Sequence, residues 1–250
     1  MSGLAYSHLI EPKWFNTVYV KFPYHQRLRI VQLTDFHVCQ ENPAEFLTKP
    51  FLHALSLKPD ILCLTGDFLT DTTERWNEFE KVFSTLTITN IPVVAVLGNH
   101  DGGEYSLQRY AGYPSNKRVV NSLSKAGIKV LQNEHFNFNS VDFVGLDDVY
   151  AGNPIIPSYI GKDPILLSHN PDSKDLLPDF NWRLMLSGHT HGGQFWLPGI
   201  GAPIVPVKDK NYVRGLLPWR DKHINISAGI GTSFGGRFLC RPEINVIDLG

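Results

Sequence analysis

Short runs of apolar residues recur along the chain and predict strands of a buried sheet. They occupy residues 29–33, 60–64, 92–97, 141–146, 164–167 and 183–186. Brief apolar runs bounded by turn-forming residues are typical of strands that are covered on both faces. We therefore expect these six segments to form the centre of the fold.

Two segments between the first strands show helical spacing instead. Apolar side chains recur every three or four residues at Trp76, Phe79, Val82, Phe83 and Leu86, which places them on one face of a helix. Residues 46–57 follow the same pattern, with a proline near their start. Strands alternate with helices early in the chain and dominate later, which predicts an α/β sandwich of mixed sheets. Without an internal repeat or a Gly/Ser linker, residues 1–250 are expected to form a single domain.

Composition restricts the classes of function. With 42% apolar and 19% charged residues, the chain has the make-up of a soluble globular protein. A net charge of -1 disfavours a protein that wraps nucleic acid, so we expect no nucleic-acid partner. The cysteines, Cys39, Cys63 and Cys240, are too few and odd in number for the disulfide framework of a secreted domain. A reducing compartment is therefore expected.

The N-terminal region has neither a basic segment followed by an apolar one, as in a signal peptide, nor the apolar length of a membrane span. Residues 1–15 read MSGLAYSHLIEPKWF, and nowhere does an apolar run approach the roughly 20 residues that cross a bilayer. We expect a cytoplasmic protein, with peripheral contact at the inner face of the membrane as an open alternative.

Five of the apolar runs end in polar residues of one chemical kind. The segments read LTDFH, LTGD, LGNHD, LSHNPD and LSGHTH. Ligand sites in open α/β sheets lie at the carboxyl ends of strands, where loops leave a rigid scaffold. These five strand ends are therefore expected to converge on one site.

The polar residues are suited to holding metal ions. Asp35 and His37 are two apart, so they would face the same side of a continuing strand, and His189 and His191 repeat that spacing. Carboxylate, imidazole and amide donors suit Mn, Fe or Zn. A single ion needs about four to six ligands, whereas two ions sharing a bridging carboxylate, with Asp67 as the natural bridge, would use all the candidates. The seven candidate ligands are Asp35, His37, Asp67, Asn99, His169, His189 and His191. Paired ions of this kind hydrolyse bonds at phosphorus.

These motifs, in this order, resemble the calcineurin-like metallophosphoesterase family. The matching blocks are Asp35-x-His37, Gly66-Asp67, Gly98-Asn99-His100-Asp101, His169 and Gly188-His189-Thr190-His191. Five ordered blocks are far more specific than any one of them. The resemblance implies a four-layer α-β-β-α sandwich of two mixed sheets. It also implies two divalent metal ions, for which we expect Mn²⁺, with Fe or Zn as alternatives.

The resemblance further divides the residues into roles. The first metal would be held by Asp35, His37, Asp67 and His191, and the second by Asp67, Asn99, His169 and His189. His100 would lie beside the phosphate as a catalytic residue, with its ring oriented by Asp71 or by Asp101. The nucleophile would be a hydroxide that bridges the metals and attacks in line.

A longer match resembles a narrower, often membrane-associated subgroup. The strings GHTHGGQ and GIGTSFGGRFLCRPEINVI carry it, and some subgroup members are UDP-2,3-diacylglucosamine pyrophosphatases of lipid A biosynthesis. The loop after Gln194 is rich in apolar residues, so Phe195 and Trp196 could contact an acyl chain or a bilayer, or could pack on their own domain. Arg237 could grip a substrate phosphate or form a structural ion pair. The expected substrate is a phosphate-containing small molecule or lipid.

Other functions remain as alternatives. A protein phosphatase fits poorly, because Gly66-Asp67 is followed by FLTD without the arginine found there in phosphatases of this family. A nuclease is disfavoured because the chain has no excess of basic residues to bind nucleic acid. A phosphodiesterase for another lipid or a nucleotide, and a non-catalytic scaffold with the same fold, stay open.

Overall fold

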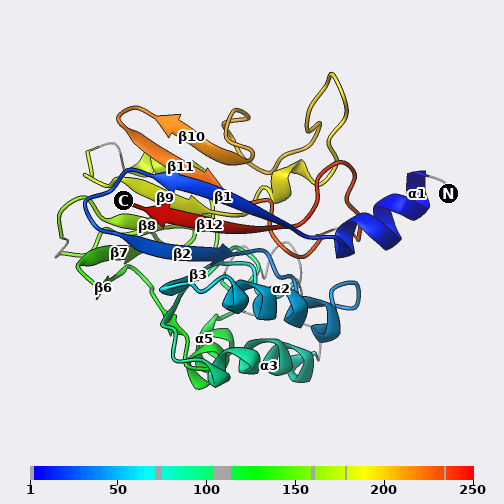
Figure 1. Ribbon diagram of the computed structural model, residues 1–250, viewed down its shortest axis with the longest axis horizontal. Coiled ribbons are helices and arrows are strands. Elements are labelled where there is room, and N and C mark those ends of the chain that lie inside the picture. The colour runs from blue at the N-terminus through cyan, green and yellow to red at the C-terminus, as the bar shows by residue number, and fades with distance from the viewer. Residues whose placement is uncertain (1–2, 71–74, 104–113, 159–160, 178, 234) are drawn as a thin grey trace.

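Two six-stranded sheets form the body of the chain. The computed structural model describes residues 3–70, 75–103, 114–158, 161–177, 179–233 and 235–250. The first sheet has the order β1-β12-β2-β3-β4-β5 and the second the order β10-β11-β9-β8-β7-β6 (Figure 1). The strands of the first sheet are β1 (Asn16–Phe22), β2 (Leu28–Leu33), β3 (Ile61–Thr65), β4 (Val93–Val96), β5 (Lys129–Val130) and β12 (Glu243–Leu249). Those of the second are β6 (Glu134–Phe138), β7 (Val141–Gly145), β8 (Ile165–Leu167), β9 (Leu184–Ser187), β10 (Gly215–Trp219) and β11 (Lys222–Ile226).

Both sheets combine parallel and antiparallel pairs. In the first, β2, β3, β4 and β5 run parallel, and β12 pairs antiparallel with β2. In the second, β7, β8, β9 and β11 run parallel, and the outer strands β6 and β10 pair antiparallel with their neighbours. The parallel strands β3, β4, β8 and β9 are almost entirely apolar because both of their faces are buried. The predicted sandwich of mixed sheets is confirmed.

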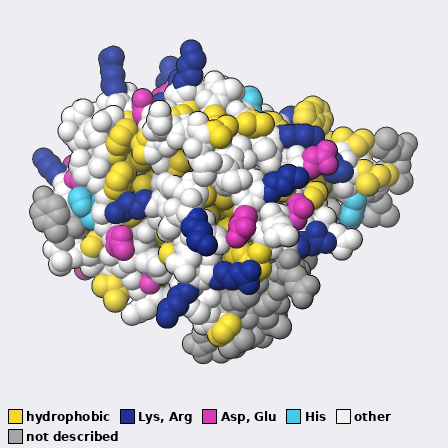
Figure 2. Space-filling view, turned by 90° about the horizontal axis from the view of Figure 1, so that it is seen from below, with side chains coloured by type: hydrophobic (Ala, Val, Ile, Leu, Met, Phe, Trp, Pro, Cys, Tyr) yellow, Lys and Arg dark blue, Asp and Glu magenta, His cyan; other side chains and the backbone are white. Residues whose placement is uncertain are grey.

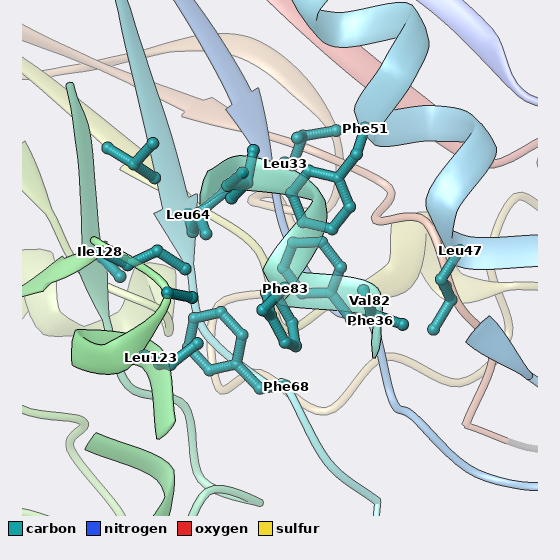
Figure 3. Close-up of a cluster of buried hydrophobic side chains, with 14 of the residues drawn as sticks. Leu33, Phe36, Leu47, Phe51, Leu64, Phe68, Val82, Phe83, Leu123 and Ile128 are labelled. Atoms are coloured by element: carbon teal, nitrogen blue, oxygen red, sulfur yellow. The ribbon is translucent and has the colours of Figure 1, made fainter. Parts of the chain in front are cut away.

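Helices cover the outer face of the first sheet. They are α2 (Ala44–Ser56), α3 (Trp76–Ser84), the 3-10 helix η3 (Thr85–Ile88) and α5 (Lys117–Lys125). Figure 3 shows the apolar core between these helices and the sheet, where Phe36 stacks on Phe51 and Phe68 with ring centroids 5.2 and 5.4 Å apart. Phe36 stands in the sequence between Asp35 and His37, two residues that could hold a metal. The apolar core around Phe36 therefore also supports the loop after β2.

A second apolar layer joins the two sheets, and one polar group crosses it. Ile30 and Val94 of the first sheet pack with Phe143 and Leu184 of the second. Gln32 donates to Ser187 O at 2.9 Å and accepts from Asn225 at 3.0 Å, so its carboxamide links β2 to β9 and β11. The outer face of the second sheet packs against Leu177, Phe180 and Trp182, which follow the 3-10 helix η4 (Pro171–Leu176), and Trp182 stacks on Trp219 there.

All six predicted strands and both predicted helices are present, with ends shifted by a few residues. The prediction missed β1, β5, β6, β10, β11, β12 and α5. Most of these strands lie at or near sheet edges, where one face carries polar or half-exposed side chains, so their sequences lack continuous apolar runs. β12 lies between β1 and β2, and Asn245 and Asp248 interrupt its apolar pattern.

The chain begins with a short helical segment that projects from the body in Figure 1. It comprises α1 (Gly3–Ala5), the π-helix η1 (Tyr6–Ile10) and the 3-10 helix η2 (Glu11–Lys13). Among the described residues, no helix has the length and apolar character needed to traverse a bilayer.

Candidate metal centre

The predicted ligands lie together at one edge of the sandwich, where the parallel strands of both sheets end. Asp35 and His37 follow β2, Asp67 follows β3, Asn99 and His100 follow β4, His169 follows β8, and His189 and His191 follow β9. Strands that run parallel end on the same side of a sheet, so their following loops meet there. All eight of these residues are buried.

The backbone at most of these residues is left-handed, which differs from the expected continuing strand. Asp35, His37, Asp67, His189 and His191 have φ of 54°, 47°, 54°, 68° and 52°. This conformation costs a residue with a side chain about 1–2 kcal/mol, and such strain gathers at functional sites. Hydrogen bonds to the loop after β3 maintain it, since Asp35 N donates to Gly66 O at 2.9 Å and His37 N donates to Asp67 O at 3.0 Å. The prediction that Asp35 and His37 extend a strand is therefore wrong, because β2 ends at Leu33.

Two glycines allow the loops to approach so closely. A Cβ on Gly98 would overlap the backbone and carboxylate of Asp67, and a Cβ on Gly188 would overlap Thr34 and the carboxylate of Asp35. Each motif glycine therefore makes room for a carboxylate of the neighbouring strand end.

The first cluster of ligand atoms comprises Asp35, His37, Asp67 and His191, all within 4.8 Å of one another. His191 Nε2 lies 3.0 Å from His37 Nε2 and 3.3 Å from Asp35 Oδ1. Metal–imidazole bonds of about 2.1 Å at right angles would separate two ring nitrogens by about 3 Å. These atoms are therefore spaced as neighbouring ligands of one cation.

The second cluster comprises Asp67, His169 and His189 within the same 4.8 Å limit. Asp67 Oδ2 lies 3.1 Å from His169 Nε2 and 3.5 Å from His37 Nε2, so one carboxylate oxygen faces both clusters. Asn99 Oδ1 is buried without a hydrogen-bond partner among the described residues, and its side chain lines the same cavity as Asp67. A buried amide oxygen without a donor is suited to a cation.

His189 and His191 contribute to different clusters, although their spacing matches that of Asp35 and His37. Two carbonyls fix which ring nitrogen can bind an ion in the second cluster. His169 Nδ1 donates to Thr65 O at 2.7 Å, and His189 Nε2 donates to Pro206 O at 2.9 Å. Because a carbonyl only accepts, these nitrogens carry protons, and His169 Nε2 and His189 Nδ1 are the nitrogens that can bind an ion.

Burial and neighbouring charges shift the pKa values of these groups. Burial lowers the pKa of His37 and His189 to about 3, which keeps both rings neutral and able to act as ligands. Burial also raises the pKa of Asp35 to about 7, opposed by His169. Burial disfavours the charged form of His169, but the Asp67 carboxylate outweighs this effect and raises its pKa well above the usual value.

His100 lies beside both clusters and lines the cavity. Its backbone N–H donates to Asp67 Oδ1 at 3.0 Å, and its Nδ1 lies 3.1 Å from Thr70 O. Asp71, one predicted partner of this ring, lies outside the described residues. The other, Asp101, accepts hydrogen bonds from the backbone N–H groups of Asp67, Phe68, Leu69 and Gly98. Its carboxylate therefore supports the turn of Asp67, which argues against the predicted role as partner of the His100 ring.

Arg237 is fully buried, and its guanidinium faces backbone carbonyls. Its nitrogens donate to the oxygens of residues 228, 229, 231, 240 and 191. It holds the loop after β11 in place, and its geometry argues against the predicted contact with a substrate phosphate. The predicted structural ion pair also differs from what is seen, since carbonyls take its hydrogen bonds.

A cavity of about 390 Å³ opens onto both clusters. Its lining combines the polar residues Asp67, Asn99, His100, His189 and His191 with the apolar residues Phe195, Ile204 and Pro206. Trp196 lies outside this lining and is 40% exposed. Of the two aromatic residues predicted to bind substrate, Phe195 is therefore placed at the cavity, and Trp196 is placed on the surface beside it.

Among the polar residues that line the cavity, Ser233 and Gln194 were not predicted as site residues. The position of Ser233 follows from a feature that the apolar runs did not reveal. β11 runs parallel to β9, so the loop after β11 reaches the same edge of the sheet as His189 and His191.

Comparisons with known proteins agree with this geometry. Residues 28–193 match the family described as calcineurin-like phosphoesterase. The chain belongs to this family. It is 34% identical to Phosphodiesterase YaeI of Escherichia coli, over 99% of this chain and 93% of that protein. It is 32% identical to the uncharacterized metallophosphoesterase YkuE of Bacillus subtilis, over 88% of this chain and 78% of that protein. It is 28% identical to UDP-2,3-diacylglucosamine pyrophosphatase LpxG of Chlamydia muridarum, over 91% of this chain and 85% of that protein.

As a member of the calcineurin-like phosphoesterases, the chain is a metal-dependent phosphoester hydrolase. Its donors fit divalent ions, because two clusters of buried carboxylates and imidazoles share Asp67. The mixed sheets and the site at their edge are those of a metallophosphoesterase fold.

Proposed function

We propose that this hydrolase cleaves a phosphodiester or pyrophosphate bond in an amphiphilic substrate, with UDP-2,3-diacylglucosamine as the first candidate. One observation carries the proposal. A single cavity is lined by candidate ligands of both clusters and His100, and also by the apolar side chains of Phe195, Ile204 and Pro206. A phosphate bound at the clusters would therefore place the rest of the substrate against apolar side chains.

We assign the ions to the two clusters. Asp35, His37, Asp67 and His191 would hold the first ion, and Asp67, Asn99, His169 and His189 the second. Ions bound there would polarise phosphoryl oxygens and lower the pKa of water to about 7, which would supply a hydroxide nucleophile at neutral pH. Mn²⁺ is the proposed metal, with Fe or Zn as alternatives, because carboxylate, amide and imidazole donors suit this group.

His100 is the residue proposed to act on the substrate directly. Its ring lies 4.9 Å from that of His37, nearly perpendicular to it, and it lines the cavity without belonging to either cluster. Its Nδ1 lies 3.1 Å from Thr70 O, which orients the ring at the cavity. An imidazole in this place can bind a phosphoryl oxygen or protonate the leaving oxygen.

Two relatives support the type of bond. YaeI is named a phosphodiesterase and LpxG a pyrophosphatase. Both activities cleave a P–O bond at a phosphorus that carries two substituents. The LpxG match is the weaker of the two at 28% identity. A phosphodiesterase for another lipid or for a nucleotide is the alternative, and a non-catalytic scaffold is the second.

A substrate panel with two matched variants tests the proposal. The Mn²⁺-loaded protein is assayed in detergent with UDP-2,3-diacylglucosamine, the unacylated UDP-N-acetylglucosamine and an aryl phosphodiester. Ile204→Ser changes the cavity lining, whereas the control Ile88→Ser changes a similarly exposed isoleucine, 75% against 78%, which lies in η3 and outside the lining. We expect the acylated substrate to be preferred, and we expect only Ile204→Ser to raise its KM.

The outcomes separate the alternatives. Equal turnover of the acylated and unacylated substrates, or preference for a soluble nucleotide, would defeat the lipid substrate while leaving the hydrolase intact. Full occupancy by metal with no turnover of any substrate would favour the non-catalytic scaffold.

We also propose peripheral contact with a membrane surface on the side of the cavity. A Cβ added to Gly236 would lie 3.2 Å from the His8 ring and 3.2 Å from the Phe195 ring. The N-terminal helix and the loop after Gln194 are therefore neighbours. Exposed apolar side chains on these two segments are Leu9, Ile10, Trp196, Ile200 and Ile204. Figure 2 shows apolar side chains gathered at the end of the molecule from which the N-terminal helix projects. Cosedimentation with phospholipid vesicles should fall for Leu9→Ser combined with Ile200→Ser, and unchanged binding would refute the contact.

A further inference from the structure

The hydroxyl of Ser233 faces the first cluster from the loop after β11. Ser233 Oγ lies 2.9 Å from His191 Nε2 and 3.5 Å from His37 Nε2, and these two nitrogens are 3.0 Å apart. Three atoms with these separations can all lie about 2.1 Å from one point, which is the usual distance from a divalent ion to its nitrogen and oxygen ligands. The serine oxygen is thus spaced as a ligand beside the two imidazoles.

Buried side chains hold the loop that presents this hydroxyl. Gln194 accepts from Ser233 N at 2.8 Å and donates to Gly236 O at 2.9 Å, so its carboxamide joins the loop to the segment after His191. Asn42 donates to Thr232 O at 2.9 Å and to His37 O at 3.0 Å. Each carboxamide therefore connects the Ser233 loop to the backbone near one of the two histidines.

The same loop is fixed from two further directions. Gly231 N donates to Asp35 O at 2.7 Å, and Arg237 Nη2 donates to Gly231 O at 2.6 Å. A Cβ on Gly231 would overlap the Phe36 carbonyl, so this close approach to the Asp35 turn requires glycine. Because the loop is fixed in this way, the hydroxyl is positioned with little freedom to turn away from the cluster.

We propose that Ser233 is a neutral oxygen ligand of the ion in the first cluster. This inference rests on the proposed use of that cluster for a metal. Asp35, His37, Asp67 and His191 provide four donors, and a divalent ion of the Mn²⁺ type accepts up to six. A hydroxyl ligand adds no charge, so it completes the coordination without weakening the pull of the ion on a substrate oxygen.

A cysteine in place of the serine gives a direct spectroscopic test. A thiolate bound to Co²⁺ produces a charge-transfer band in the near ultraviolet, because sulfur is a soft donor that transfers charge to the metal. In Co²⁺-loaded protein we expect this band for Ser233→Cys and expect it to be absent from the unmutated protein. The matched control is Thr232→Cys, because Thr232 lies in the same loop and directs its hydroxyl to Asn42 at 3.4 Å.

A second variant keeps the test decisive if the cysteine disturbs folding. Ser233→Ala removes a single oxygen atom, and we expect one of the two Mn²⁺ affinities to fall about tenfold while the other stays unchanged. The proposal is overturned if both affinities stay within twofold of the unmutated protein. It is also overturned if Ser233→Cys binds Co²⁺ fully without the band, or if Thr232→Cys shows the same band.

Failure of this inference is distinct from failure of the proposed function. If the unmutated protein binds fewer than two Co²⁺ ions, the proposed assignment of two ions is wrong. If it binds both ions and the Ser233 variants behave like it, only the role of Ser233 is wrong.

Discussion

The Asp101 carboxylate accepts a hydrogen bond from the backbone N–H of Asp67 at 2.9 Å. Three more backbone N–H groups, those of residues 68, 69 and 98, donate to the same carboxylate. Asp101 therefore holds the left-handed turn that aims the Asp67 carboxylate at both clusters. A residue next to His100 in sequence thus acts on the metal bridge through the backbone.

Asp101→Asn should weaken both folding and metal binding. The amide group would turn its NH₂ toward backbone N–H donors, and each buried donor left without an acceptor costs about 1–3 kcal/mol. Urea unfolding of the metal-free protein and a Mn²⁺ titration measure the two effects. Asp60→Asn is the control, since its carboxylate accepts from the backbone N–H of Arg29 at 2.7 Å, at the end of β2 remote from Asp35. It should lose stability but keep its metal affinity, and equal metal affinity in Asp101→Asn would contradict the assignment.

The sequence was most informative where one physical rule applied to several segments at once. Apolar runs reveal parallel strands buried on both faces, and parallel strands end on the same edge, so the meeting of Asp67 with His169 could be predicted without coordinates. The same rule failed for β11, because Lys222, His223 and Asn225 interrupt its apolar pattern. For that reason Ser233, which follows this strand, was missed.

Local conformation and side-chain partners were less accessible. The left-handed backbone of Asp35 and His37 depends on hydrogen bonds from segments about 30 residues away, so spacing within the motif alone suggested a strand. Arg237 looked like a phosphate ligand because an arginine near a site commonly has that role. Its burial and its carbonyl partners follow only from the path of the loop after β11.

His100→Ala should reduce turnover while both ions stay bound. The ring lines the cavity but belongs to neither cluster, so its removal takes away a group that acts on the substrate. General acid catalysis commonly contributes about 10²–10⁴ to the rate, so kcat should fall by about that factor. Metal content and kcat are measured together, with His53→Ala as the control because His53 bonds Thr17 instead. Loss of an ion in His100→Ala would show that His100 is a ligand.

Arg237→Met should destabilise the fold rather than change substrate affinity. The guanidinium donates to five backbone carbonyls, and their loss leaves several buried acceptors without donors, which should cost at least about 3 kcal/mol. Arg29→Met is the control, since Arg29 and Asp248 are 40% and 35% exposed at their side chains and form an ion pair of 2.7 Å, and a surface pair contributes about 1 kcal/mol or less. Unchanged urea stability together with a raised KM would restore the phosphate contact.

Metal affinity should rise with pH between 6 and 8, because two ligands must lose protons before they bind. Burial raises the pKa of Asp35 to about 7, and the Asp67 carboxylate raises the pKa of His169 above its usual value, so both groups hold a proton at pH 6. His37 and His189, with pKa values of about 3, are already neutral and release none. Cations therefore compete with about two protons at pH 6 and with fewer at pH 8, where Asp35 is ionised. Calorimetric Mn²⁺ titrations in buffers of different ionisation enthalpy count these protons, and a binding reaction that releases none at pH 6 would show that Asp35 and His169 are already deprotonated in the metal-free protein.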